Sequence, residues 1–183
     1  SDKALEKVAA MDLDDADLFE IRIIVDQIKS LNKSIDEINK ELIDRGKKLD
    51  GHKGLTSITG IGDISATILL NTIGNVDDFG DDKKLAAYFG IVPRVAVSNE
   101  TSHYGKITKR GNKIARTALV QSTLVAIRYN AYLRRFYFKL KAKKGSGKAI
   151  IATARKLLTI VYRTLKNDWV FEDFNKFKLA VSV

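Results

Sequence analysis

The residues best suited to chemistry lie between Gly90 and Arg116. Ser98 stands in a polar stretch of this segment, four residues after Arg94. A serine among cations is suited to attack a phosphodiester, because Arg and Lys side chains stabilise negative charge on the phosphate oxygens. The other polar residues of this segment that we expect to contact phosphate are Lys106, Lys109, Arg110, Asn112 and Arg116.

Other roles for these residues stay open on physical grounds alone. Serine in a loop often bonds its own backbone, so Ser98 could be a simple turn residue. Ser102 is only four residues away and could be the nucleophile, and His103 is near enough in sequence to act as a base. The chain contains no Gly-x-Ser-x-Gly motif, which argues against an acyl hydrolase.

A second motif lies upstream, where Ile58-Thr59-Gly60-Ile61-Gly62 precedes an apolar helical pattern. Two glycines allow the backbone to turn sharply and to approach a phosphate, which the N–H groups of the next helix can then bind. We therefore predict a helix-hairpin-helix over residues 55–73, with Gly60 and Gly62 at the DNA backbone. The alternative is a plain turn between two helices without a ligand.

The charge distribution favours a polyanionic partner. The net charge is +10, yet residues 1–50 hold nine basic and thirteen acidic residues, whereas residues 94–166 hold eighteen basic residues and a single acidic one, Glu100. Such a one-sided field is typical of nucleic-acid binding, although basic residues can also serve only solubility. The absence of cysteine excludes disulfides and thiolate metal sites, and the two histidines have no ligand spacing.

These residues must be positioned by helices, because the chain has one proline and many helix-forming residues. We predict an all-α fold with a long acidic coiled-coil helix in residues 1–49 and a compact helical domain in residues 50–183, which carries the serine loop over 91–110. The heptad seam comprises Ile21, Ile24, Ile28, Leu31, Ile35, Ile38 and Leu42. The alternative is an ordinary amphipathic helix that packs on its own domain. Expected helices cover residues 63–72, 83–89, 113–129, 130–143 and 149–166.

Two expectations concern the end of the compact domain. The run from Lys143 to Lys148 contains two glycines and predicts an exposed basic loop. The aromatic residues of the tail, Trp169, Phe171, Phe174 and Phe177, are expected to pack on the domain. The aromatics around Phe136 are expected to be mostly core, with solvated lysines after them.

Residues 55–129 resemble the C-terminal domain of the DEDD-type insertion-sequence transposases, the group that includes the pilin-gene invertases and the bridge-RNA-guided recombinases. The resemblance rests on the order and spacing of several elements. The first elements are the Ile-Thr-Gly-Ile-Gly hairpin, then Phe79, and then the segment Leu85-Ala86-Ala87-Tyr88-Phe89-Gly90-Ile91-Val92-Pro93-Arg94. Ser98 follows, and the last element is Gly105-x-Ile107-x-Lys109-x-Gly111-Asn112-x-x-x-Arg116. One position departs from the family, since Asn99 stands where a glycine is usual.

The resemblance implies a DNA transposase or recombinase in which Ser98 forms a covalent bond to DNA. It implies DNA as a partner, a guide RNA as a further one, and no membrane. The family's four carboxylates, which bind Mg²⁺, belong to an N-terminal half that we do not find in this chain. We therefore expect a cytoplasmic, nucleoid-associated fragment without its own cofactor, inactive alone and forming a homo-oligomer through the coiled coil. The alternative is a non-catalytic helix-hairpin-helix module that binds nucleic acid.

Overall fold

The computed structural model describes residues 6–8, 10–11, 14–98 and 101–171, with the backbone alone for residues 96–98 and 101–104. The chain divides into two compact units, residues 1–44 and 45–183. Each unit is described by itself below.

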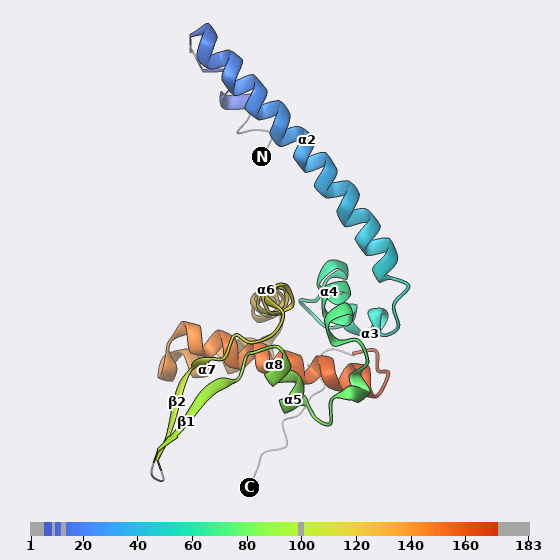
Figure 1. Ribbon diagram of the computed structural model, residues 1–183, viewed down its shortest axis with the longest axis vertical. Helices are drawn as coiled ribbons and strands as arrows, with labels where there is room; N and C mark the ends of the chain where they lie inside the picture. Colours follow the sequence, from blue (N-terminus) through green and yellow to red (C-terminus); the bar gives the residue numbers. More distant parts are fainter. Residues whose placement is uncertain (1–5, 9, 12–13, 99–100, 172–183) are drawn as a thin grey trace. The chain divides into compact units, whose positions relative to one another are not determined.

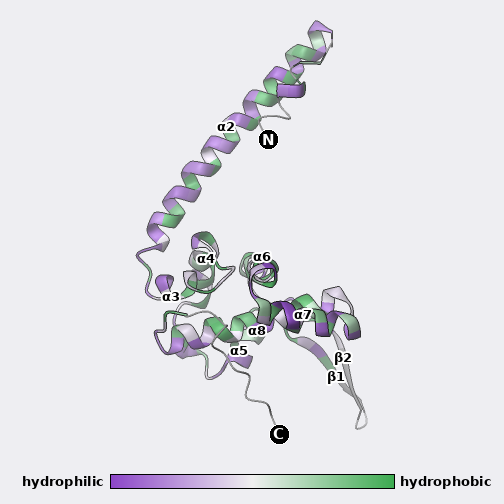
Figure 2. Cartoon of the chain, turned by 180° about the vertical axis from the view of Figure 1, so that it is seen from behind, coloured by the Kyte–Doolittle hydropathy of each residue, from purple (hydrophilic) through white to green (hydrophobic). Residues whose placement is uncertain are grey.

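The first unit consists mainly of the long helix α2, which spans Asp15–Gly46 and continues into the second unit. The carboxylate of Asp14 accepts a hydrogen bond from the Asp17 N–H at 2.8 Å and so caps the start of this helix. Along α2, hydrophobic residues recur between hydrophilic ones (Figure 2). Most members of the predicted seam are exposed, Leu31 and Ile38 to 63% and 66%, whereas Ile21 and Leu42 at its ends are half-buried. This helix therefore presents an apolar stripe.

The second unit is built from helices and one small hairpin, as the ribbon shows (Figure 1). In chain order its elements are α3 (His52–Thr56), α4 (Asp63–Ile73), the 3₁₀ helix η1 (Val76–Asp78), α5 (Asp82–Tyr88), β1 (Pro93–Ser98), β2 (Thr101–Ile107), α6 (Lys113–Tyr129), α7 (Ala131–Lys144) and α8 (Ser146–Lys166). The predicted all-α class is confirmed. The predicted serine loop over residues 91–110 contains the antiparallel strand pair β1–β2.

Side-chain caps set where several of these helices begin. The Asp81 carboxylate accepts from the Lys84 N–H at 2.7 Å at the start of α5. Asn130 separates α6 from α7, and its buried side chain accepts from the Leu133 N–H at 3.0 Å. Because Asn and Asp satisfy free N–H groups at a helix start, these residues allow sequence reasoning to find the boundaries closely.

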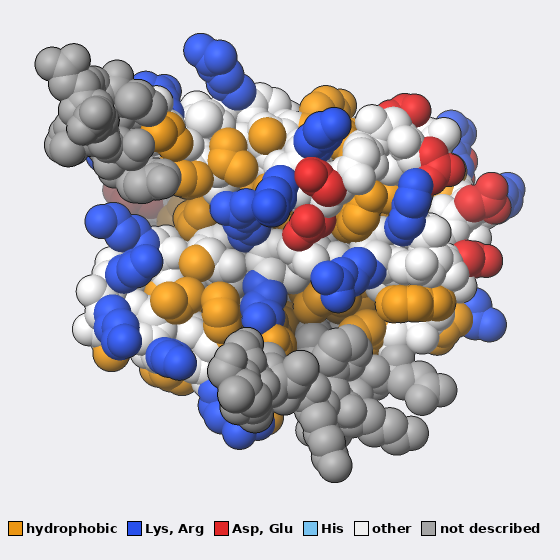
Figure 3. Space-filling model, turned by 90° about the horizontal axis from the view of Figure 1, so that it is seen from below, with side chains coloured by type: hydrophobic (Ala, Val, Ile, Leu, Met, Phe, Trp, Pro, Cys, Tyr) orange, Lys and Arg blue, Asp and Glu red, His pale blue; other side chains and the backbone are white. Residues whose placement is uncertain are grey.

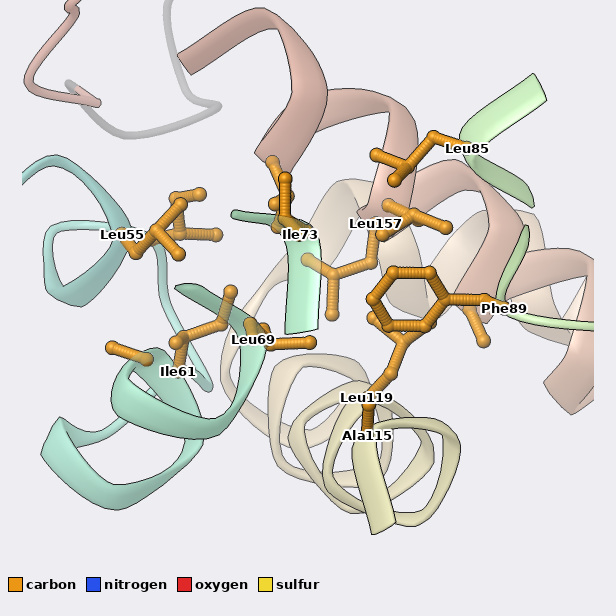
Figure 4. Packing of buried hydrophobic residues seen from close by; sticks show 14 of the residues in the cluster. Leu55, Ile61, Leu69, Ile73, Leu85, Phe89, Ala115, Leu119 and Leu157 are labelled. Atoms are coloured by element: carbon orange, nitrogen blue, oxygen red, sulfur yellow. The ribbon is translucent and has the colours of Figure 1, made fainter. Parts of the chain in front are cut away.

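Helix α8 lies at the centre of the second unit and contacts α3, α5, α6, α7 and η1. Its residues Leu157, Leu158 and Val161 are fully buried. Figure 4 shows Leu157 beside Leu85 and Phe89, with Leu119 and Ala115 of α6 below them and Ile61, Leu69 and Ile73 on the other side. At its last turn, Lys166 pairs with Asp77 of η1, and this hydrogen bond raises the pKa of the Lys166 amine.

For the end of the chain, one expectation was wrong and another was confirmed only in part. The predicted basic loop at Lys143–Lys148 shrinks to Gly145, because α7 runs to Lys144 and α8 already begins at Ser146. Gly145 makes this sharp joint possible with φ of +78°, a left-handed conformation that glycine tolerates. Trp169 does not pack on the domain but is 54% exposed, whereas Phe171 is partly buried against the core. Phe174 and Phe177 lie outside the described residues.

Candidate nucleic-acid interface

The hairpin that carries Ser98 is a two-stranded antiparallel ribbon that extends from the helical unit (Figure 1). Pro93 pairs with Ile107 at its base, and Ser98 pairs with Thr101 at its tip. The register shifts between these pairs, so that Arg94 alone faces Gly105 and Lys106. A bulge of this kind bends the ribbon and changes the direction of its side chains. Arg94 and Lys106 are both exposed there.

The base of the hairpin is a tight crossing of two backbone segments, which sequence reasoning missed. A Cβ on Gly90 would lie 1.9 Å from the carbonyl oxygen of Arg110, and a Cβ on Gly111 would lie 2.0 Å from that of Tyr88. Both glycines also have positive φ, +66° and +108°. The Lys109 N–H donates to the Gly90 carbonyl at 3.0 Å and closes the crossing. The close approach of the two backbones leaves no room for a side chain at either position. The two glycines were therefore the signal in the sequence from which this crossing could have been predicted.

Arg116 holds this crossing from the side of α6. One nitrogen of its guanidinium, Nη1, donates to the carbonyls of Phe89 and Lys109, each at 3.3 Å. These carbonyls belong to the two segments that cross, so Arg116 links α5, the base of β2 and α6. Its first role in the fold is therefore to position the hairpin.

The structure does not bring all of the predicted site residues together. Lys109, Arg110 and Arg116 lie at the base of the hairpin, whereas Ser98 lies at its tip. The five residue steps from Pro93 to Ser98 span about 16 Å at the rise of an extended strand. We expected arginines to surround the serine, and Arg110 and Arg116 do not. Arg94, on the same strand as Ser98, is the closer candidate for a phosphate held at the serine.

Helix α6 begins at the base of the hairpin with its N–H groups partly satisfied by Asn112. The side-chain oxygen Oδ1 of Asn112 accepts hydrogen bonds from the N–H groups of Ile114 at 2.8 Å and Ala115 at 3.2 Å. Lys109, Arg110 and Lys113 surround this helix start, and all three are exposed. The first turn of α6 contains no acidic residue. The positive end of the helix dipole and three cations thus act at one place, which suits an anion.

The turn between α3 and α4 contains the predicted glycine pair, and the two glycines meet different surroundings. Gly60 has φ of +100°, and a Cβ there would lie 2.5 Å from the Ser122 carbonyl oxygen of α6. Gly62 is the N-cap residue just before α4, and a Cβ there would meet no atom within 4 Å. Ile58 and Ile61 are buried, as the prediction required. Gly60 therefore lets the turn pack against α6, and only Gly62 faces open space.

The start of α4 also carries an acidic residue close to a buried histidine. Nε2 of His52 lies 3.6 Å from a carboxylate oxygen of Asp63, the first residue of α4. This carboxylate competes with a phosphate for the positive end of α4. A shallow groove runs between the turn and α6, and its lining is neutral. The lining residues are Thr56, Ile58, Thr59, Gly60, Ile61, Gly62, Ser65, Gln121, Ser122 and Val125.

The surface charge of the second unit is uneven. Figure 3 shows Lys and Arg side chains across one face, with acidic ones gathered on the side where η1 and α4 lie in Figure 1. Toward the side of α7 and the hairpin, the charged side chains in this view are basic, with hydrophobic ones between them. This half of the surface is the better candidate for a nucleic-acid backbone.

Among the residues that the structure describes, no three or more His, Asp or Glu side chains are grouped as a metal site would require. None of the helices in these ranges is both long and apolar enough to cross a membrane.

Comparisons with known proteins agree on one family. Residues 52–138 match the model of the transposase family IS116/IS110/IS902. The chain is 32% identical over 156 residues to the pilin gene-inverting protein of Moraxella bovis, covering 80% of this chain and 48% of that protein. It is 35% identical over 123 residues to the pilin gene-inverting protein of Moraxella lacunata, covering 64% of this chain and 38% of that protein.

A transposase for insertion sequence element IS1111A from Coxiella burnetii is 25% identical over 143 residues, covering 76% of this chain and 39% of that protein. The chain thus spans less than half the length of each of these three relatives. The matched residues include α3 to β2, α6 and most of α7, so the hairpin, the crossing at its base and Arg116 all lie within the match. Residues 52–138 thus resemble the transposase domain of the IS116/IS110/IS902 family, and the comparisons support a fragment of a transposase of this type.

Proposed function

We propose that this chain binds DNA and supplies Ser98 as the nucleophile for strand cleavage and transfer in the movement of an insertion sequence. The observation that carries the proposal is the place of Ser98 at the tip of a projecting ribbon, within the residues that match the transposase family model. The family resemblance assigns the nucleophile to this serine. Such a ribbon can reach a scissile phosphate while the helical unit holds the neighbouring DNA.

In the proposed reaction, the Ser98 oxygen attacks phosphorus and a deoxyribose oxygen leaves as a hydroxyl. One phosphodiester is replaced by another, so that the strand can be rejoined by the reverse attack without an energy source. Arg94 is exposed and lies four residues before Ser98 on the same strand, and in this proposal its long side chain reaches toward the attacked phosphate and neutralises its charge. The Mg²⁺ and carboxylates implied by the family resemblance would have to come from another part of the natural protein.

DNA binding is assigned to a second group of residues at the base of the hairpin. Lys106, Lys109 and Arg110 are exposed, and the capped start of α6 adds its dipole. In this proposal Lys109 and Arg110 bind the DNA backbone at least about 16 Å from the serine, a distance of roughly five base-pair steps, and Lys106, which faces Arg94, binds it nearer to the serine. These residues therefore position the DNA rather than stabilise the transition state. Gly62 offers a further backbone N–H group at the start of α4.

The partners follow from the same surfaces. The exposed apolar stripe of α2 suits a second copy of this chain, because identical heptad seams are complementary to each other. A guide RNA is a proposed further ligand of the basic half of the second unit, on the family resemblance. The proposed location is the cytoplasm of a bacterium or archaeon, where the DNA substrate lies.

A non-catalytic binding module is the second candidate. It is favoured by one observation, namely that the cations at the hairpin base are separated from Ser98. Such a module would bind DNA equally well without the serine.

Recombination assays with Ser98→Ala and Ser102→Ala, in the protein at its natural length, separate the two candidates. We expect Ser98→Ala to abolish strand transfer while the affinity for DNA stays within about twofold, and Ser102→Ala to remain active. The pair is well matched, because both serines lie in the same ribbon and lose the same hydroxyl group. Full activity of Ser98→Ala would favour the binding module.

A further inference from the structure

Helix α7 lies in the basic half of the second unit and presents a surface that mixes cations with an exposed aromatic ring. Arg134, Arg135, Phe138 and Lys141 recur at helical spacing and lie on one face, and all four are exposed. We refer to these four residues as the α7 platform. The opposite face of α7 packs on the domain through Leu133, which is fully buried, and through the half-buried Phe136. Phe138 thus lies in the centre of the solvent-facing side, 54% exposed.

The surroundings of Phe138 indicate what could cover it. Its ring contacts Tyr137 edge to face, with centroids 5.2 Å apart, and the Lys141 amine lies 5.8 Å from its centroid. Helix α7 contains no acidic residue. An apolar protein surface would bury Phe138 only by desolvating three neighbouring cations, which is costly. A partner that combines flat apolar rings with negative charge fits the platform better, and an unpaired polynucleotide has both.

Parts of the platform are already fixed in place. The Arg134 guanidinium donates from Nε to the Ile127 carbonyl at 3.1 Å and from Nη2 to the Arg128 carbonyl at the end of α6.

Arg135 and Lys141 are six residues apart, or about 9 Å along a helix axis. This separation is of the order of one to two nucleotides in a single strand. The two cations can therefore bind phosphates on either side of a base that stacks on Phe138.

We propose that the α7 platform binds unpaired nucleotides, with a base stacked on Phe138 and phosphates held by Arg135 and Lys141. A paired duplex would hide the faces of its bases, so the platform discriminates single strands from double strands. The inference rests on the proposed nucleic-acid function and deepens it, since it assigns single-stranded DNA or RNA to a separate surface from the hairpin.

The test is the binding of the 183-residue chain, by fluorescence anisotropy, to labelled dT12, rU12 and a 20-base-pair duplex. We expect Phe138→Ala to weaken single-strand binding by about tenfold, the range of one lost base–aromatic stack, and to leave duplex binding within twofold. Phe138→Trp restores binding, because Trp offers a stacking surface of its own. Trp169→Ala, which removes another exposed aromatic, leaves all three affinities unchanged.

The two single strands identify the source of the ligand. Equal losses on dT12 and rU12 support a site for either strand, and a loss confined to one of them supports that nucleic acid alone. Equal loss on the duplex, or no loss on either single strand, overturns the proposal. A failure of the platform proposal is distinguishable from a failure of the proposed function. The proposed function is tested by strand transfer and duplex binding with Ser98→Ala, and neither of these measurements depends on Phe138. Melting temperatures of the variants establish that each is folded.

Discussion

At the scale of single residues, Gly60 and Gly62 show that the same residue type can serve different purposes within one turn. Gly60 is left-handed and lies against the backbone of α6, whereas Gly62 is extended and open. Alanine at Gly60 would meet both backbone strain and a collision with Ser122. We expect Gly60→Ala to lower the free energy of unfolding by about 2–4 kcal/mol, from the left-handed conformation and overpacking together.

Gly62→Ala is the matched control for this prediction. It should cost only about 0.5–1 kcal/mol, the difference between glycine and alanine at a helix start. Urea denaturation of both variants measures the two values. Equal stability of the two proteins would mean that Gly60 does not pack on α6 as described.

Arg116 is the second residue whose role the fold explains. Its bonds to the carbonyls of Phe89 and Lys109 fasten the hairpin base, and hydrogen bonds from charged groups contribute more than neutral ones. We expect Arg116→Ala to lower the free energy of unfolding by about 1.5–3 kcal/mol. Lys113→Ala, an exposed cation on the same helix, should stay within about 0.5 kcal/mol of the parent in the same denaturation experiment. If Arg116→Ala were as stable as the parent protein, the fold would not depend on Arg116, and its role would be ligand binding alone.

At the scale of elements, the start of α6 joins folding and binding. Asn112 caps the helix, and it is also one of the residues that we expect near phosphate. Asn112→Asp separates these roles, because aspartate caps as well as asparagine but adds a negative charge. We expect Asn112→Asp to keep its melting temperature and to bind duplex DNA several-fold more weakly. Asn112→Ala should instead lose about 1 kcal/mol of stability. Unchanged DNA affinity of Asn112→Asp would exclude the start of α6 from the interface.

Helix α2 is the element whose partner we propose to be its own copy. Leu31 and Ile38 lie on the exposed seam, whereas Lys33 and Lys40 lie on the opposite side of the helix. We expect the double change Leu31→Gln with Ile38→Gln to raise the dissociation constant of the oligomer at least 100-fold, since each buried aliphatic side chain contributes roughly 1.5–3 kcal/mol. Sedimentation equilibrium measures this constant. Lys33→Gln with Lys40→Gln should leave it unchanged, and equal effects of the two pairs would refute the seam.

The elements also show what the sequence could and could not predict. The helix starting after Asn112 and the one after Asp81 were placed closely, because caps act through neighbouring residues. The boundary at Gly145 was wrong, since a left-handed glycine can join two helices as well as form a loop. The separation of Ser98 from Arg110 and Arg116 was not predictable, because it depends on strand pairing rather than on distance along the sequence. The crossing at Gly90 and Gly111 was missed for the same reason.

At the scale of the whole molecule, the functions proposed here are spread over separate surfaces. The serine is at the tip of the ribbon, the cations proposed to hold duplex DNA are at its base, and the α7 platform is on another helix. The first unit is acidic overall, whereas the basic residues gather in the second unit, which contains the residues that match the transposase family model. A strand-transfer enzyme requires such a division, because it must hold DNA throughout a reaction that occurs at one phosphate.

The central claim is that Ser98 forms the bond to DNA, and mass spectrometry of the trapped protein–DNA adduct tests it most directly. The natural-length protein is reacted with its DNA, denatured, and digested with nuclease and trypsin. Trypsin cuts after Arg94 and Lys106, which releases residues 95–106 with Ser98, Thr101, Ser102 and Tyr104 together. We predict a nucleotide phosphate on this peptide, with fragment ions that place it on Ser98. A phosphate on Ser102, Thr101 or Tyr104, or an unmodified peptide from a reaction that yields recombinant product, would contradict the account.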